Sequence, residues 1–414
     1  QLPVINDLEL NYYLENLGTR LLASATGQQF PFSFIIIRDP NINAFAAPGG
    51  IVAINTGLIE TASTESELAA VLAHEIAHVT QRHLARFFQQ SSKINLGTTL
   101  GILAAILASA YAPSAGQAAL YAGLAANSSA KLGFTRAHER EADRIGTSIL
   151  SRSGFDTQAM ITFFEKLQAE TFSDPDKANE FLQTHPLPGA RAADRFDPLH
   201  YQRKGDLDSL QFQIFKARSR GLTHPAATLT SRTIASADQR YYSKAVSLAH
   251  NHQPAAALKW LDKLSPRWKR APQIQLLAAT SDQQQAHQGK NTAIIEKLFR
   301  NAPDNPTFLA AITHRYLTMK AYGRALQLLS ENTRLVDHWL PLLKLKADAA
   351  EKSGHQAISH EALAKYYANQ GSLSLALEQI DIAEHHPNTT LVIKARLDEL
   401  KSKLEALQHE DTIN

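Results

Sequence analysis

The sequence predicts a mainly α-helical protein, in which an α+β domain with a small β-sheet precedes an all-α domain of helical repeats. Apolar residues recur at helical spacing through most of the chain. Only two short apolar runs, both in the first 60 residues, are bounded by turn residues as strands are. From residue 241 on, short helical units carry small residues at a period of about 34 residues.

Length and composition fit two folded domains. A chain of 414 residues with 44% hydrophobic residues is long enough for two domains and apolar enough for real cores. We expect the first domain over residues 1–205, a connector over 206–240 and the repeat domain over 241–414.

Charge and cysteine content exclude several functions. The net charge is +3 and the basic residues are scattered, which argues against nucleic-acid binding. The chain has no cysteine, so disulfides, cysteine-ligated zinc and thiol catalysis are excluded together. It begins at Gln1 without a basic and then apolar leader, and we expect that an export signal has been removed.

The first elements in chain order are a helix and two strands. Leucines at helical spacing predict a helix over residues 7–26. The apolar run 34–37 predicts a buried strand. Residues 43–50 read as a turn with paired glycines, followed by a second strand over 51–55 at the sheet edge. Such an edge can bind an extended peptide substrate, and the alternative is an ordinary hairpin.

The stretch from Leu68 to Arg86 holds the strongest chemical signal, an HExxH motif. On a helix, His74 and His78 share one face and can reach one metal ion, while Glu75 beside them can take a proton from a water. Thr64 and Glu67 form a capping box that predicts where this helix begins. Two imidazoles in an apolar helix predict one Zn²⁺ per chain.

A later helix supplies the third ligand of this site. In the predicted helix over residues 134–150, Glu139 and Asp143 share a face, whereas Glu141 points away. A catalytic zinc takes three protein ligands, for which His74, His78 and Glu139 suffice. Asp143 is then placed to accept the N–H of a ligand imidazole.

An uncharged stretch separates the two motif helices. Residues 94–130 contain no Asp, Glu, Lys, Arg or His. Its first part, residues 94–111, is 18 residues long, which is marginal against the roughly 20 apolar residues of a bilayer span, and it is diluted by polar residues. It can form a buried helical hairpin, a surface that dips into a membrane or a lid over the site. We expect a mobile hairpin that meets a membrane or an apolar client protein, the alternative being plain core.

HEIAH at 74–78 and EREAD at 139–143, about sixty residues on, resemble the HExxH/ExxAD gluzincin metallopeptidases that include HtpX and the CAAX-prenyl protease. The run at 43–50 is also similar to that family, and the resemblance covers about residues 5 to 200. It implies zinc ligation by His74, His78 and Glu139, with Glu75 as general base and Asp143 behind the ligands.

His185 lies in a Thr-His-Pro segment, and the family shows a similar one. An imidazole near the open zinc position can stabilise the oxyanion of the tetrahedral intermediate. It can also occupy that position as a fourth ligand and keep the enzyme idle. The alternative is a structural histidine bonded to the backbone. A helix is expected just before this segment, over residues 157–172.

The C-terminal half resembles tetratricopeptide repeats. Positions 11, 15, 20 and 27 of one unit are filled by Tyr367, Gly371, Ala376 and Ala383. Small residues expected at helix crossings recur at Ala257, Ala293 and Ala325. Helix pairs of this kind stack into a superhelix whose concave face binds other proteins, whereas a generic helical bundle would have no partner.

Together these features look like the periplasmic protease-chaperone branch of the gluzincins. The resemblance implies a zinc endopeptidase that aids outer-membrane β-barrel protein assembly and degrades stalled clients. The repeats would engage the barrel-assembly machinery, and residues 94–130 would supply any peripheral membrane contact. Two alternatives stay open: a binding chaperone or adaptor with a largely latent zinc site, and a membrane-embedded metalloprotease.

Overall fold

The computed structural model describes residues 3–27, 31–47, 49–83, 85–86, 136–173, 185, 209–282, 284 and 287–413. These residues fall into two compact units, one ending at Trp268 and the other beginning at Lys269. The structure is mainly α-helical with one small sheet, as the sequence predicts. The sequence predicts a repeat domain that begins at residue 241, which lies before the start of the second unit at Lys269.

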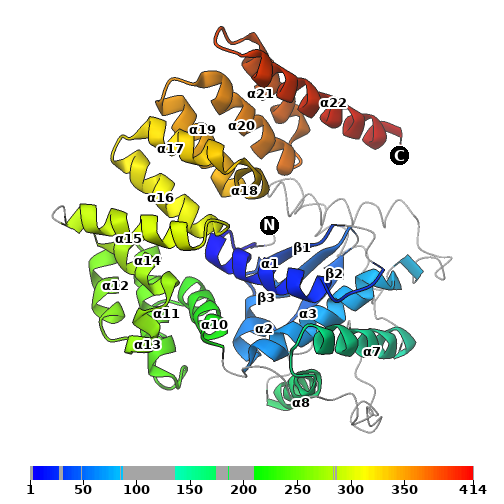
Figure 1. Ribbon diagram of the computed structural model, residues 1–414. Coiled ribbons are helices and arrows are strands. Elements are labelled where there is room, and N and C mark those ends of the chain that lie inside the picture. The colour runs from blue at the N-terminus through cyan, green and yellow to red at the C-terminus, as the bar shows by residue number, and fades with distance from the viewer. Residues whose placement is uncertain are drawn as a thin grey trace. The chain divides into compact units, whose positions relative to one another are not determined.

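The first unit contains the sheet and the motif helices (Figure 1). Its described elements are α1 (Leu8–Leu22), β1 (Ser33–Ile37), β2 (Ala44–Ala47), β3 (Ile51–Asn55), α2 (Thr56–Thr61), α3 (Glu65–Thr80), α7 (Arg136–Arg152), α8 (Gln158–Ser173), α10 (Leu210–Thr223), α11 (Ala237–His250) and α12 (Pro254–Leu261), with α13 (Pro266–Lys269) at the boundary.

The sheet has three strands in the order β1-β3-β2. β1 runs parallel to β3, and β2 pairs with β3 as an antiparallel hairpin. β3 is therefore central, and the expectation that residues 51–55 form the edge is wrong. β1 and β2 are the two edge strands, and β2 lies in the run expected to be a turn. Gly50 has φ +82°, and a Cβ there would lie 2.2 Å from the Pro31 carbonyl oxygen, so the hairpin requires glycine.

Helix α3 lies at the centre of this unit. It packs against β2, β3, α1, α7 and α8, and its side chains from Ser66 to His78 are buried on every face. The core around it combines Leu10 and Leu14 of α1 with Leu68 and Leu72 of α3 and Phe163 of α8. A helix apolar all round belongs in an interior, which makes its two histidines and Glu75 conspicuous.

Both ends of α3 have identifiable causes. Thr64 caps it, because its hydroxyl accepts from the Glu67 N–H at 3.2 Å, as predicted. The Glu67 carboxylate accepts from the Ser63 N–H at 2.6 Å instead of returning to Thr64. The helix ends at Thr80, because Arg82 adopts the left-handed region with φ +53°.

The stretch expected to be a connector contains α10, which packs on α1 and α2. Phe212 and Phe215 of α10 belong to the core of the first unit. Arg218 binds the Asp7 carboxylate through two nitrogens, each 2.8 Å from an oxygen. Asp7 is also the N-cap of α1, so one ion pair joins the start of the chain to residues two hundred positions on.

The second unit is helical in its described residues. Its elements are α14 (Pro272–Ser281), α15 (Gln288–Asn301), α16 (Pro306–Thr318), α17 (Tyr322–Glu331), α18 (Thr333–His338), α19 (Leu340–Lys352), α20 (Gln356–Asn369), α21 (Leu373–His385) and α22 (Leu391–Ile413).

Neighbouring helices in this unit pack in chain order, most extensively α19 on α20 and α20 on α21. Ala376 and Ala383 are fully buried against α20, and Ala325 is buried in α17. Ala293 is exposed on α15, so the expectation that it marks a helix crossing is wrong. The tetratricopeptide assignment itself stays a prediction.

Among the helices that the structure describes, none has both the length and the apolar character needed to cross a membrane. The uncharged stretch 94–130 lies outside the described residues, and so do the expectations attached to it.

Candidate metal centre

Helix α3 brings the two motif histidines together. The Nε2 atoms of His74 and His78 lie 3.0 Å apart, and both rings are buried. One helical turn separates them, so they project from the same face, as the i, i+4 spacing requires. Glu75 follows His74 on the helix and has no exposed surface.

Helix α7 packs along α3 and adds a carboxylate to this pair. Oε2 of Glu139 lies 3.5 Å from His74 Nε2, and Oε1 lies 3.5 Å from His78 Nε2. One turn further on, Oδ1 of Asp143 lies 3.0 Å from His74 Nδ1, on the ring edge away from the cluster. Glu139 therefore faces the two imidazoles while Asp143 stands behind one of them.

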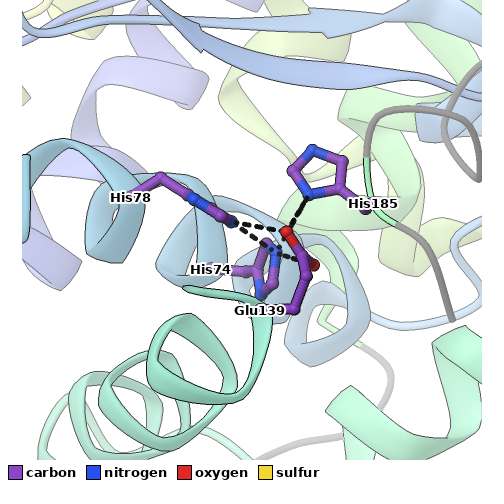
Figure 2. A group of neighbouring side chains, drawn as sticks. All are labelled: His74, His78, Glu139 and His185. Carbon is purple, nitrogen blue, oxygen red and sulfur yellow. Dashed lines mark hydrogen bonds and ion pairs between the residues drawn. The ribbon is translucent and has the colours of Figure 1, made fainter. Parts of the chain in front are cut away.

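His185 completes the cluster, although no other residue between 173 and 209 is described. Its Nδ1 lies 3.2 Å from Oε1 of Glu139 and 3.4 Å from Nε2 of His74 (Figure 2). Its Nε2 lies 3.5 Å from Oε1 of Glu75. One imidazole thus contacts the ligand cluster through one nitrogen and the expected base through the other.

The donor set and its spacing fit one zinc ion. The four buried residues His74, His78, Glu139 and His185 offer donor atoms that all lie within 4.8 Å of one another. Donors about 2.0–2.1 Å from a tetrahedral zinc are about 3.3 Å apart, from simple geometry. The donor separations given above run from 3.0 to 3.5 Å around that value. Nitrogen and oxygen ligands in this number are typical of Zn²⁺.

The electrostatics of the cluster suit a cation. Burial alone raises the pKa of Glu139, but hydrogen bonds from His185 and His74 hold it well below its usual value, so the carboxylate is charged. Burial lowers the pKa of His78 well below normal, which keeps that imidazole neutral and able to bind metal. Burial also lowers the pKa of His74, but Asp143 and Glu139 outweigh this and raise it to about 10. The two carboxylates thus attract positive charge to this point.

Glu75 differs from Glu139 in its surroundings. Burial raises the pKa of its carboxyl, an effect that His185 and His74 only partly offset. The backbone of Ala46, on the edge strand β2, lies close to the carboxylate and also lowers this pKa. A buried carboxylate with a raised pKa is suited to accept and return a proton near neutral pH.

Two residues near the site were not anticipated from the sequence. His83 is fully buried, and its Nδ1 lies 2.9 Å from Nδ1 of His78. Its Nε2 lies 3.0 Å from Oε2 of Glu141, the carboxylate expected only to point away from the zinc face. The sequence does show a histidine five residues after His78, but on a continuous helix its side chain would point away from the face of the motif histidines.

A buried HExxH helix, a carboxylate from the next described helix and a small sheet alongside define a metallopeptidase type of site. Residues 9–194 match the family model of peptidase family M48. The resemblance to HExxH gluzincins is therefore confirmed.

Named relatives agree with this match. The chain is 44% identical over 223 residues to the beta-barrel assembly-enhancing protease of Escherichia coli strain K12, covering 53% of this chain and 45% of that protein. The Yersinia pestis protein of the same name is 42% identical over 213 residues, with 51% and 44% covered. A mitochondrial metalloendopeptidase OMA1 of Schizosaccharomyces pombe is 34% identical over 174 residues, with 42% and 48% covered. The chain thus spans less than half the length of these relatives.

Proposed function

We propose that this chain is a zinc-dependent endopeptidase that also serves as a chaperone-like quality-control factor for outer-membrane β-barrel protein assembly in the periplasm. The observation that carries the enzymatic part is the convergence of His74, His78 and Glu139 at zinc-ligand spacing, with Glu75 buried beside them. The setting and the clients rest on the relatives named beta-barrel assembly-enhancing protease.

The mechanism divides between the residues of the cluster. When bound, a zinc ion held by His74, His78 and Glu139 supplies a Lewis acid that polarises the peptide carbonyl and acidifies water. Glu75 takes the proton of the attacking water and returns it to the leaving amine nitrogen. Asp143 holds the His74 ring through Nδ1, which leaves Nε2 directed at the ligand cluster.

The edge strand β2 is the binding surface that we assign to the substrate. In the described part of the chain its only strand partner is β3, and α3 packs against it. An extended peptide can add to such an edge through main-chain hydrogen bonds. Because the backbone of Ala46 lies close to the Glu75 carboxylate, a peptide paired with β2 would pass beside the proposed base.

His185 has two roles open to it. Its Nδ1 is within reach of the cluster and fits a fourth ligand that keeps the site closed. Once displaced, the same imidazole can hydrogen-bond the oxyanion formed during cleavage. Its 3.5 Å approach to Glu75 supports a position beside the reacting groups in either role.

The repeats of the C-terminal half are the part that we assign to the barrel-assembly machinery and its stalled clients. Sequential packing of α19, α20 and α21 is what stacked helix pairs require. Residues 94–130 would supply any peripheral contact with a membrane.

Replacing the base tests the enzymatic part. Glu75→Gln keeps the shape of the side chain but removes the proton acceptor, so degradation of an unfolded outer-membrane β-barrel protein should fall by at least about 100-fold, in line with the contribution of general-base catalysis. Bound zinc should stay near one per chain. Glu165→Gln, at an exposed position of α8, is the control and should cleave normally.

The outcomes separate the alternatives. Loss of cleavage with preserved assembly support shows two separable activities. Equal cleavage by Glu75→Gln and the native protein contradicts the proposed base. A native protein that binds zinc and supports assembly but never cleaves indicates the latent-site adaptor.

A further inference from the structure

Beyond the four clustered residues, a hydrogen-bonded chain extends from the back of His78 to the surface. Nδ1 of His78 faces Nδ1 of His83 at 2.9 Å, with the two rings nearly perpendicular at 78°. Nε2 of His83 then faces Oε2 of Glu141 at 3.0 Å. Arg86 binds the same oxygen at 2.9 Å, and the side chain of Glu141 is 31% exposed.

The proton positions along this chain follow from hydrogen-bonding chemistry. Figure 2 shows that Nε2 of His78 faces Glu139, which makes it the metal-binding nitrogen. A neutral imidazole that binds metal through Nε2 carries its hydrogen on Nδ1. His78 therefore donates from Nδ1, and Nδ1 of His83 must accept. His83 then carries its hydrogen on Nε2, where the Glu141 carboxylate accepts it.

We propose that His83 and Glu141 are positioning residues for the metal centre, fixing the tautomer and ring orientation of His78 through the His78–His83–Glu141 chain. Both links match a donor with an acceptor only when the hydrogens lie as described. The opposite tautomer of His83 would set two N–H groups against each other and would remove the hydrogen bond from His83 to Glu141, which would then keep only its contact with Arg86.

The contact between His78 and His83 depends on the backbone conformation of Arg82. Five residues further along a continuous helix, a side chain points roughly 140° away from its starting face. Arg82, in the left-handed region, ends α3 and turns the chain back, so that His83 returns to the side of His78. The ring of His138 on α7 stacks on His83, with centroids 4.7 Å apart and planes at 17°, and fixes its plane.

Zinc affinity of the full chain, measured by competition with a chelating dye, tests the inference. His83→Leu removes the acceptor, and the zinc dissociation constant should rise 10–100-fold, the usual effect of losing a partner of a metal ligand. His83→Asn places Oδ1 near the former Nδ1 and should restore affinity to within about threefold, because one acceptor of the same kind is kept. Glu141→Ala removes the group that fixes the tautomer of His83, and its zinc dissociation constant should lie between those of the two His83 variants.

A second readout follows the metal itself. With Co²⁺ in place of zinc, the visible absorption of His83→Leu should differ from that of the native protein, whereas His83→Asn should match it. Far-UV circular dichroism of the metal-free variants checks that they fold. Because Glu141 is partly exposed, its variant keeps the test valid if His83→Leu does not fold.

The inference rests on the zinc site of the proposed function, and the two can fail separately. A native protein that binds no zinc overturns both. Native zinc binding together with unchanged affinity and spectrum in His83→Leu or, should that variant not fold, in Glu141→Ala overturns the positioning chain alone. Equal losses in His83→Leu and His83→Asn overturn it as well, since the acceptor would then not matter.

Discussion

At the scale of single residues, two of the proposed metal ligands each contact a neighbouring side chain through Nδ1, the ring nitrogen away from the cluster. Asp143 contacts His74 on Nδ1 at 3.0 Å, and His83 contacts His78 on Nδ1 at 2.9 Å. The two imidazoles thus have different partners at Nδ1: a carboxylate for His74 and a second imidazole for His78. A carboxylate partner raises the basicity of its ligand more than a neutral ring does.

This difference leads to a prediction for Asp143. Asp143→Asn keeps an oxygen acceptor for His74 but removes the charge, so zinc affinity should fall about tenfold. Asp143→Ala removes the acceptor as well, and the loss of zinc affinity should approach about 100-fold. Chelator competition at pH 7.5 measures both values. Asp304→Asn, at an exposed position of the second unit, should bind zinc as the native protein does. Native affinity in Asp143→Ala would show that the contact does not orient His74.

At the scale of elements, the site depends on how closely α7 approaches α3. Gly146 lies on α7 one turn after Asp143, and a Cβ there would lie 3.1 Å from the backbone nitrogen of His74. The backbone carbon and oxygen of Ala73 would lie at 3.2 Å. The missing side chain therefore lets α7 carry Glu139 and Asp143 up to the motif helix.

Gly146→Ala should consequently lower both stability and metal binding. Separating two packed helices typically costs about 1–3 kcal/mol of unfolding free energy. The displaced α7 should also weaken zinc binding, measured by dye competition alongside urea unfolding. Gly289→Ala is the matched control, because a Cβ on that helical glycine meets no atom within 4 Å. It should stabilise the chain by roughly 0.5–1 kcal/mol. If the Gly146 variant behaved like this control, the close approach would be irrelevant.

Helical periodicity explains which parts of the site were predictable. His74 and His78 on α3, like Glu139 and Asp143 on α7, share a face because of spacing alone, and the structure brings all four together. The contact of His83 was not predictable, because it depends on a left-handed Arg82, and arginine carries no preference for that region. The order of the strands is likewise absent from a pattern of apolar residues, so β3 was placed at the edge in error.

At the scale of the whole molecule, the apolar pattern predicted helices in both halves but not where one unit ends. Packing decides that boundary: Phe212 and Phe215 of α10 bury their rings in the first core, and Arg218 of the same helix binds Asp7. No local signal in residues 206–240 reveals partners two hundred residues away. The second unit has a core cluster of its own, formed by α20, α21 and α22.

Two units with separate cores, only one of which holds the metal centre, should respond differently to metal removal. Scanning calorimetry should resolve two transitions, and chelation of zinc should lower only the one that belongs to the first unit. Free zinc at 100 times its dissociation constant adds about 2.7 kcal/mol to the stability of the state that binds it. For a domain of roughly 150–250 residues this corresponds to about 5–10 °C. His78→Ala should show the same two transitions with and without zinc. If both transitions of the native chain moved together on chelation, the units would be energetically coupled and the assignment of separate cores would be wrong.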